Sequence, residues 1–321
     1  MAVQNFGGGN GNALGYQKAF DAHVVSIFVR HAERLKSANE NVGLAHTYDN
    51  LVARAIAYQK LGRARLAAQD YLEAFKTEGK LRLQDMKNAS LCLEMSGQHD
   101  KAMELAKETC LLYSHDFSAL LFAGKLLYNN EKYQESVSYF RKALDTMRFH
   151  ALIVSKLPFY TRALSSLAMS LYCCADYKGA SQSFTEFLNL RPDNISALVH
   201  RAECDLMVGN HVRAVGDLMY ASALEPDNYL VLTRLGIALS SVGQLEEGRC
   251  YLEMALGEKG GHYAAALYNL GIYHYHMGDY SASMGYMTKA ASEDKIFAHV
   301  AGKYIEKIKA IFRNEAGESG E

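Results

Sequence analysis

The side chains of this sequence best suited to bind a metal ion are histidines and cysteines that lie close together along the chain. His274 and His276 are separated by one residue, and Cys173 and Cys174 are adjacent. Both pairs fall in segments predicted to be helical, where residues one or two apart point in different directions. Two such side chains do not converge on one ion, so we expect no metal site at either pair.

The sequence shows no residue pattern typical of catalysis. No serine or cysteine lies with a base and an orienting acid in a recognisable nucleophile motif. The glycines of residues 7–9 follow no predicted strand and lack the spacing of a phosphate-binding loop. We therefore expect no catalytic residues, no cofactor and a protein that is not an enzyme.

The composition indicates a folded helical protein. Of 321 residues, 49% are hydrophobic and 21% are charged, with a formal net charge of -1. A near-neutral balance argues against a general nucleic-acid binder, which would carry a basic excess. Only three prolines are present, which favours helices because an internal proline costs a helix about 3 kcal/mol.

Cysteine usage and hydropathy bear on the compartment. The six cysteines have no metal-ligand spacing and lie in segments predicted to be helical, so we expect buried free thiols in a reducing, cytoplasmic environment. No stretch approaches the roughly 18 apolar residues of a membrane span. We expect no membrane-spanning segment.

A fixed period organises the chain. Arg191-Pro192-Asp193-Asn194 and Glu225-Pro226-Asp227-Asn228 lie 34 residues apart, and each follows a helix-like segment. Two of the three prolines fall on this period. A period of 34 is typical of stacked helical hairpins, whose single members cannot bury their own apolar faces.

The clearest repeat begins at Phe117. Its first helix carries Leu120 and Gly124, a turn follows at residues 131–133, and its second helix carries Phe140 and Ala143. Small residues allow the two helices to cross closely, and large residues fill the space beside the crossing. This pattern resembles the tetratricopeptide repeat.

Seven repeats follow the pattern in register. The large residue of the first helix is Leu51, Met86, Leu120, Leu164, Leu198, Leu232 and Leu267, and the small residue four positions later is Ala55, Ser90, Gly124, Ala168, Ala202, Gly236 and Gly271. Asp205 replaces a large residue in the fifth repeat, and Phe187 a small one in the fourth. The resemblance implies an all-α fold, a right-handed superhelical solenoid of helix-turn-helix repeats closed by N- and C-terminal capping helices.

The expected organisation follows from the repeats. We expect a flexible glycine-rich segment at 1–15, an N-terminal capping helix within 16–47, repeats at 48–150, an apolar insertion at 151–160, further repeats at 161–297, a capping helix at 298–313 and a disordered tail at 314–321. Two interpretations of the insertion stay open. Either the preceding helix continues and Pro158 marks its end or the start of the next helix, or the insertion protrudes and docks a partner.

The resemblance also implies a function. Proteins of this family line a concave groove with the first helix of each repeat and bind a partner's peptide or helix there. The groove residues expected here are Val52, Ile56, Lys60, Lys87, Leu91, Met95, Leu121, Lys125, Tyr128, Arg162, Met169, Tyr172, Val199, Glu203, Met207, Arg234, Ile237, Tyr268, Ile272, Tyr275 and His276. An equally weighted alternative is that several of them pack between successive turns of the superhelix.

The leading hypothesis is therefore a non-catalytic scaffold or adaptor within a larger complex, with other proteins as partners. Repeats of this family build ciliary transport complexes and other intracellular assemblies, so the resemblance makes such a complex possible here. A homo-oligomer is possible but is not implied by the resemblance. One alternative is a co-chaperone-like reader of an acidic C-terminal tail, for which Lys87 and Arg162 match the required positions but Leu91, Phe122 and Ser166 do not. Another alternative is an RNA-associated helical repeat protein, which the neutral charge disfavours.

Overall fold

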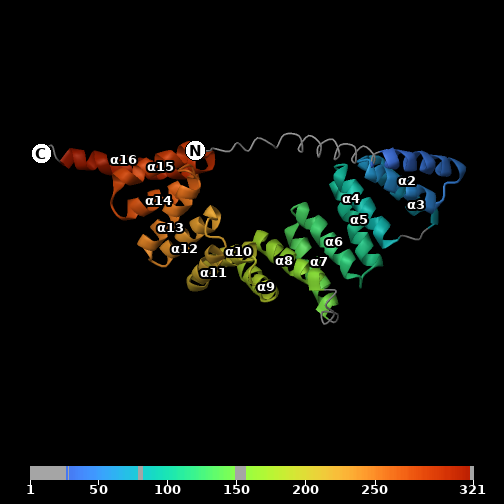
Figure 1. Ribbon diagram of the computed structural model, residues 1–321, viewed down its shortest axis with the longest axis horizontal. Helices are drawn as coiled ribbons and strands as arrows, with labels where there is room; N and C mark the ends of the chain where they lie inside the picture. Colours follow the sequence, from blue (N-terminus) through green and yellow to red (C-terminus); the bar gives the residue numbers. More distant parts are fainter. Residues whose placement is uncertain (1–26, 28, 79–81, 149–156, 319–321) are drawn as a thin grey trace, which may run out of the picture. The chain divides into compact units, whose positions relative to one another are not determined.

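The computed structural model describes residue 27 and residues 29–78, 82–148 and 157–318. The chain divides into two compact units, residues 1–152 (unit 1) and residues 153–321 (unit 2). Among the described residues the only regular secondary structure is helical, as Figure 1 shows. The predicted all-α solenoid of helical hairpins is confirmed.

Each repeat consists of a first and a second helix. In unit 1 these are α2 (Tyr48–Lys60) and α3 (Ala64–Glu78), α4 (Leu83–Met95) and α5 (His99–Leu112), and α6 (Phe117–Asn129) and α7 (Tyr133–Arg148). In unit 2 they are α8 (Leu157–Cys173) and α9 (Tyr177–Leu190), α10 (Ile195–Met207) and α11 (His211–Leu224), α12 (Tyr229–Ser241) and α13 (Leu245–Glu258), and α14 (Ala264–His276) and α15 (Tyr280–Glu293). First helices of successive repeats are also in contact: α4 contacts α6, and α10 contacts α12.

The two helices of every repeat are joined by the same backbone turn. One residue adopts a left-handed conformation, and the next residue donates its N–H to the carbonyl five positions earlier, as Arg63 does to Tyr58 at 2.9 Å. This is the Schellman motif that ends helices. The left-handed residues are Gly62, Gly97, Glu131, Ala175, Gly209, Gly243 and Gly278. Five of the seven are glycine, which adopts this conformation without a steric penalty.

The repeated Pro-Asp-Asn string joins one repeat to the next. Helix α9 ends at Leu190, and Asn194 caps α10 by accepting the Ala197 N–H at 2.9 Å. One repeat later, Asn228 caps α12 and accepts the Val231 N–H at 3.3 Å. Proline cannot continue a helix, and asparagine is a preferred N-cap, so this string ends one hairpin and starts the next.

Small residues sit where the paired helices cross. A methyl group added at Gly124 would lie 2.8 Å from the Phe140 ring, and one added at Gly236 would lie 2.8 Å from the Gly248 carbonyl oxygen. Ala180 and Ala214, at the corresponding place on second helices, are fully buried. The crossings are therefore packed too closely for larger residues.

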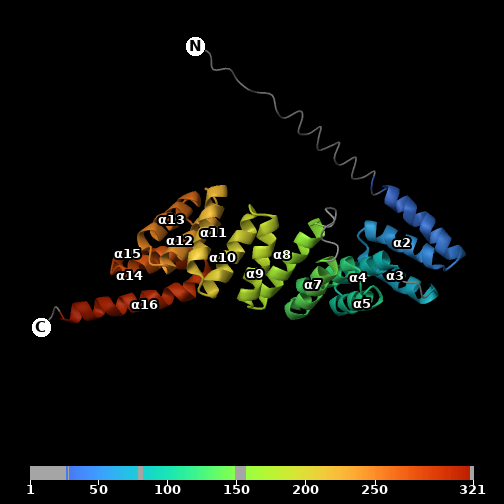
Figure 2. The same ribbon diagram turned by 90° about the horizontal axis from the view of Figure 1, so that it is seen from below.

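Additional helices lie at both ends of the repeats. Residues 29–44 are helical and bury Ala38 and Val42, and the Asn50 side chain on α2 donates to the Ala45 carbonyl at 3.0 Å. Helix α16 (Lys295–Glu318) packs on α14 and α15 and buries Ala301 and Ile308 completely; Figure 2 shows it beside them. Residues 314–318 of the expected tail form the end of α16. The segment 1–15 and residues 319–321 lie outside the described residues.

The proposed apolar insertion is described only in part. Helix α7 ends at Arg148, and α8 begins at Leu157. Pro158 therefore lies in the first turn of α8, where a missing N–H costs no hydrogen bond. Residues 149–156, to which the docking interpretation refers, lie outside the described part of the chain.

The cysteines differ from expectation. Cys92, Cys110 and Cys204 are buried, and burial raises the pKa of each thiol, to about 12 for Cys204. Cys173 and Cys250 are exposed. The prediction of buried thiols is wrong for these two, because both lie on the outward side of their helices, which helical content alone does not reveal.

Candidate partner-binding faces

The first helices of unit 1 present an aliphatic strip to solvent. Ile56 on α2 and Leu91 on α4 are each 40% exposed, and Met95 on α4 is 67% exposed. Ile56 and Leu91 occupy the same repeat position on neighbouring repeats. We call the predicted groove residues of this unit the unit 1 face; Leu121 and Tyr128 on α6 are half-buried members of it.

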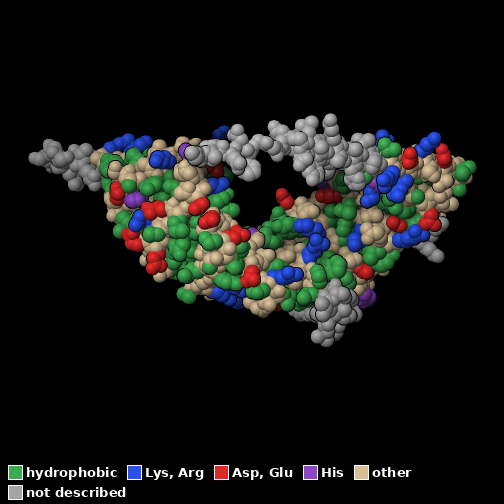
Figure 3. Space-filling model, in the orientation of Figure 1, with side chains coloured by type: hydrophobic (Ala, Val, Ile, Leu, Met, Phe, Trp, Pro, Cys, Tyr) green, Lys and Arg blue, Asp and Glu red, His purple; other side chains and the backbone are tan. Residues whose placement is uncertain are grey.

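Three lysines accompany this strip. Lys60 and Lys125 are exposed, and Lys87 is half-buried. The Lys87 ammonium lies 3.5 Å from the Ser118 hydroxyl on the next first helix, and the Lys125 ammonium lies 5.0 Å from the centre of the Tyr128 ring. Within the described residues none of the three lysines forms an ion pair with a carboxylate. Figure 3 shows basic and hydrophobic side chains together on the surface of this part of the chain.

Val52 has a different environment from the rest of the predicted set. It is 6% exposed, so its side chain belongs to the packing between helices and offers little surface to a partner.

The first helices of unit 2 carry a polar ladder. Tyr172 on α8 donates its hydroxyl to Glu203 on α10 at 3.2 Å, and Arg234 on α12 donates to the same carboxylate. Burial, assisted by the neighbouring Glu203 charge, raises the pKa of Tyr172 to about 12. The ladder therefore joins three successive repeats and satisfies the charge of Glu203 inside the chain.

Two other predicted residues of unit 2 are covered by the last helix. The Tyr275 ring lies 5.3 Å from that of Tyr304 on α16. The Tyr268 ring lies 5.4 Å from Phe297 and 6.2 Å from Tyr304. The remaining predicted residues differ in exposure: Val199 is buried, Met169 and Ile272 are half-buried, and Arg162, Met207, Ile237 and His276 are exposed.

A buried polar network surrounds Asp205, the residue that departs from the repeat pattern in the fifth repeat, and the sequence alone did not reveal it. Asp205 is fully buried and receives two hydrogen bonds from the Arg213 guanidinium. It also accepts the Ser181 hydroxyl at 2.8 Å, from the preceding repeat. A carboxylate thus occupies a position that is usually apolar because an arginine eight residues later neutralises it.

A second kind of ion pair recurs in both units and was not predicted from the sequence. Arg54 pairs through two hydrogen bonds with Asp70 at 2.7 and 2.8 Å, and Arg201 pairs in the same way with Asp217 at 2.7 Å. Each pair spans 16 residues and links the first helix of a repeat to its second. The repeated spacing of arginine and aspartate was a signal in the sequence that would have revealed it.

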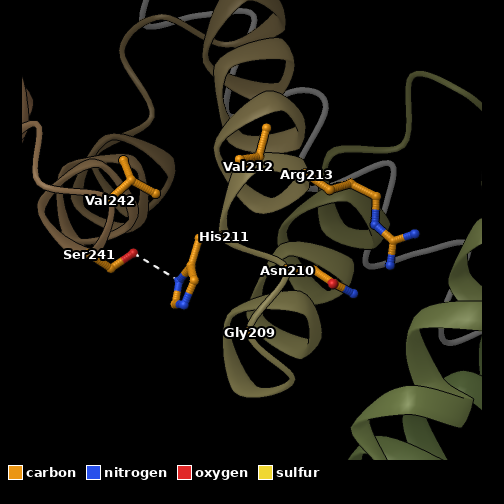
Figure 4. Close-up of a pocket in the computed structure, with 7 residues that line it drawn as sticks. All are labelled: Gly209, Asn210, His211, Val212, Arg213, Ser241 and Val242. Atoms are coloured by element: carbon orange, nitrogen blue, oxygen red, sulfur yellow. Dashed lines mark hydrogen bonds between the residues drawn. The ribbon is translucent and has the colours of Figure 1, made fainter.

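An open hollow of about 710 Å³ lies at the helix turns of the fifth and sixth repeats. Val212, which is 85% exposed, and Val242 line it, and His211 hydrogen-bonds to Ser241 at 3.2 Å. Figure 4 shows Arg213 pointing away from Ser241 and Val242. The hollow therefore offers a mainly apolar surface, with Asn210, Arg213 and the His211–Ser241 pair as its polar members.

The histidines considered as metal ligands have other contacts. The His274 ring stacks on Tyr286 with centres 5.2 Å apart, and the Tyr275 ring meets His276 edge-on at 5.8 Å. Over the described ranges, no group of three or more histidine, cysteine, aspartate or glutamate side chains could hold a metal ion. In the same part of the chain, no helix combines the length and apolar character needed to cross a membrane.

The two residues that matched a carboxylate-tail reader lie in different units. Lys87 is on α4 of unit 1, whereas Arg162 is on α8 of unit 2.

Comparison with known proteins identifies the repeat. The family described as "Tetratricopeptide repeat" matches residues 117–146, which form α6 and most of α7. Mouse tetratricopeptide repeat protein 21A is 23% identical over 317 residues, covering 83% of this chain and 23% of that protein.

Two other relatives match shorter segments. The barley protein SPINDLY, a probable UDP-N-acetylglucosamine–peptide N-acetylglucosaminyltransferase, is 28% identical over 160 residues, 47% of this chain and 17% of that protein. Outer dynein arm-docking complex subunit 4 of Xenopus laevis is 37% identical over 76 residues, 24% of this chain and 14% of that protein. This chain spans less than a quarter of the length of each of these three relatives.

A solved structure shares the fold. The C-terminal part of the TPR repeat-containing protein from Cytophaga hutchinsonii superposes with a TM-score of 0.58 at 16% identity, covering 76% of this chain and 97% of that one. At this identity the similarity concerns the fold alone.

Proposed function

We propose that this chain, which belongs to the tetratricopeptide repeat family, is a non-catalytic scaffold that holds a segment of a partner protein against its first helices. The observation that carries the proposal is the exposed strip of Ile56, Leu91 and Met95 on the unit 1 face. Exposed apolar side chains gathered on one face are typical of surfaces that bind a partner's helix or extended segment.

We further propose that the chain acts as a subunit of a larger intracellular assembly. The Xenopus laevis relative is by its name a subunit of a docking complex, and this supports a role in assembly, with a ciliary one included. The barley relative carries a transferase name, but the match spans only 17% of that protein, so it gives little support to a catalytic role here.

The test compares two double variants in an affinity purification followed by quantitative mass spectrometry. Leu91→Asp with Met95→Asp places two charges on the unit 1 face. The matched control is Leu111→Asp with Leu112→Asp on the second helix α5, where the side chains are 81% and 57% exposed. All four positions are accessible to water, so both variants should fold as the wild type does, which circular dichroism would verify.

The expected result is that a set of proteins bound by the wild type is lost from the Leu91/Met95 variant and kept by the Leu111/Leu112 control. If the Leu91/Met95 variant keeps the same proteins, the unit 1 face is not the binding surface and the proposal fails.

A further inference from the structure

We infer that the unit 1 face selects partner segments that are both acidic and amphipathic. This inference rests on the proposed function and names the chemistry of the partner. It is carried by the three lysines of the face, Lys60, Lys87 and Lys125, together with the aliphatic strip beside them.

The lysines surround the strip. Lys60 lies at the end of α2, one helical turn beyond Ile56, and Lys87 lies on α4, one turn before Leu91. Lys125 lies on α6, at the repeat position that Ile56 and Leu91 occupy in the two preceding repeats. A partner lying across these three first helices would meet a positive charge on each of them.

The acidic groups near these helices already have partners. Asp49 pairs with Arg82 at 2.8 Å, and Asp70 pairs with Arg54. Asp85 accepts the Tyr48 hydroxyl at 2.9 Å, and Glu94 accepts the Asn130 side-chain amide at 3.0 Å. Asp49 and Asp70 are therefore neutralised by arginines, whereas Asp85 and Glu94 bind neutral groups and keep their charges. Within the described part of unit 1 the three lysines outnumber these two carboxylates, and none of the three is paired with a carboxylate.

Charge complementarity decides the occupant. Carboxylates of a bound segment would neutralise the lysines, since complementary charges across an interface steer association and suppress wrong partners. The aliphatic side chains require apolar groups from the same segment, which an amphipathic helix supplies at every third or fourth residue. A single-stranded nucleic acid fits less well, because it would leave the aliphatic strip without apolar partners and finds few aromatic platforms on which to stack.

The unit 2 face provides an internal contrast. Its Glu203 charge is shared with Tyr172 and Arg234, and its last tyrosines lie under α16. The first helices of unit 2 also expose Met207 and Ile237, but Arg234 is paired with Glu203. Among the predicted groove residues, unit 2 therefore offers the exposed Arg162 where unit 1 offers three lysines.

The experiment is a selection from a phage-displayed library of random peptides of about 16 residues, long enough for four helical turns. The baits are the full chain, the variant Lys60→Glu/Lys87→Glu/Lys125→Glu, and a control, Lys101→Glu/Lys142→Glu/Lys178→Glu, whose three exposed lysines lie on second helices. Both variants change the net charge equally, which separates the local effect from the overall one. An RNA oligonucleotide is tested in parallel.

The wild type and the control should enrich peptides rich in Asp and Glu, with apolar residues at helical spacing. The best peptide should bind the triple variant at the face at least about tenfold more weakly, and its Kd for the wild type should rise with salt. Its form with Gln and Asn in place of Glu and Asp should also bind the wild type more weakly.

Other outcomes overturn the inference. Enriched peptides that are neutral or basic, or that bind the triple variant as well as the wild type, would show that the lysines do not select the partner. If such peptides still lose binding in the Leu91/Met95 variant, the proposed function survives and only the acidic preference is removed. RNA binding that the triple variant abolishes, without any acidic peptide being enriched, would replace the inference with a nucleic-acid one.

Discussion

The first helices of the two units offer equivalent positions to solvent but treat charge differently. In unit 2, Glu203 is held between Tyr172 and Arg234, so charge at this face links one repeat to the next. In unit 1 the position equivalent to Glu203 is occupied by Ile56, Leu91 and Lys125, and no carboxylate among the described residues joins the lysines of the face.

The difference separates charges that serve the fold from charges that are available to a partner. A buried ion pair within the chain is costly to break, because removing one member leaves the other unpaired. A partly exposed pair costs less. An exposed lysine without a carboxylate can be lost with little effect on folding. The two faces should therefore respond in opposite ways to substitution: unit 2 in stability and unit 1 in binding.

The largest expected effect tests whether charges paired within unit 2 stabilise the fold. Arg213→Ala removes both hydrogen bonds to Asp205, which is fully buried and keeps only the Ser181 hydroxyl as a side-chain partner. The uncompensated carboxylate should lower the free energy of unfolding of unit 2 by about 3 kcal/mol. Urea unfolding gives the loss, and hydrogen exchange of α9–α11 locates it.

The control for that variant is another arginine of unit 2. Arg249→Ala removes surface pairs with Glu246 and Glu253, which are 64% and 43% exposed, and should cost less than about 1 kcal/mol. Equal losses for the two arginines would contradict the role given to the buried network.

The next effect compares helix crossings in the two units. Gly236→Ala in unit 2 places a methyl group 2.8 Å from the backbone carbonyl of Gly248, whereas Gly124→Ala in unit 1 meets the side chain of Phe140. Backbone cannot move aside as easily as a ring, so Gly236→Ala should cost about 2 kcal/mol and Gly124→Ala less. Thermal unfolding measures both.

Gly257 supplies the matched control for the glycine variants. It lies in α13, and a methyl group added there meets no atom within 4 Å. Gly257→Ala should stabilise the helix by about 0.5 to 1 kcal/mol, because alanine is the better helix former. Stabilisation by Gly236→Ala as well would show that the crossing is looser than the distances indicate.

Much of the fold was accessible from the sequence because the same physical requirement recurs in every repeat. Small residues such as Ala55 and Gly124 mark the crossings, and the Pro-Asp-Asn strings mark the junctions between repeats. Each signal is local, so a period of 34 places it without knowledge of distant contacts. The seven helical hairpins follow from these signals alone.

The candidate faces could be predicted only in outline. The family pattern names positions that face outward, but whether a side chain is free depends on its partner in another repeat. In the sequence, Asp205 departs from the repeat pattern, which has a large apolar residue there. Only its contact with Arg213 in the structure explains why an aspartate is tolerated at this position. In the same way, the C-terminal helix was expected to cap the array, but not that its Tyr304 would cover Tyr268 and Tyr275.

A substitution with a smaller expected effect on stability, Glu203→Gln, would make the unit 2 face resemble the unit 1 face. Glu203→Gln removes the negative charge between Tyr172 and Arg234, whose side chain is 36% exposed. Because the pair is partly solvated, the loss of stability should be only about 0.5 to 1 kcal/mol. The uncompensated guanidinium should let unit 2 bind the acidic peptides selected by unit 1, more weakly than unit 1 does.

The measurement is titration of a labelled acidic peptide into the Glu203→Gln variant combined with the triple lysine variant of unit 1. Binding above that of the triple variant alone is expected. If no additional binding is seen, an unpaired positive charge is not sufficient for the unit 2 face to bind the peptide. The aliphatic strip of Ile56 and Leu91 would then account for the difference in binding between the units.

The smallest effect concerns a feature that the units share. Glu131 in unit 1 and Ala175 in unit 2 adopt φ values of 60° at the turn position where the other five repeats have glycine. Glycine removes the steric cost of the left-handed conformation but gains freedom in the unfolded chain, so Glu131→Gly and Ala175→Gly should each stabilise by about 0.5 kcal/mol. Differential scanning calorimetry should show a small rise in Tm for both, and because both turns use the same Schellman hydrogen bond, unequal shifts would indicate that one turn is additionally constrained by its surroundings.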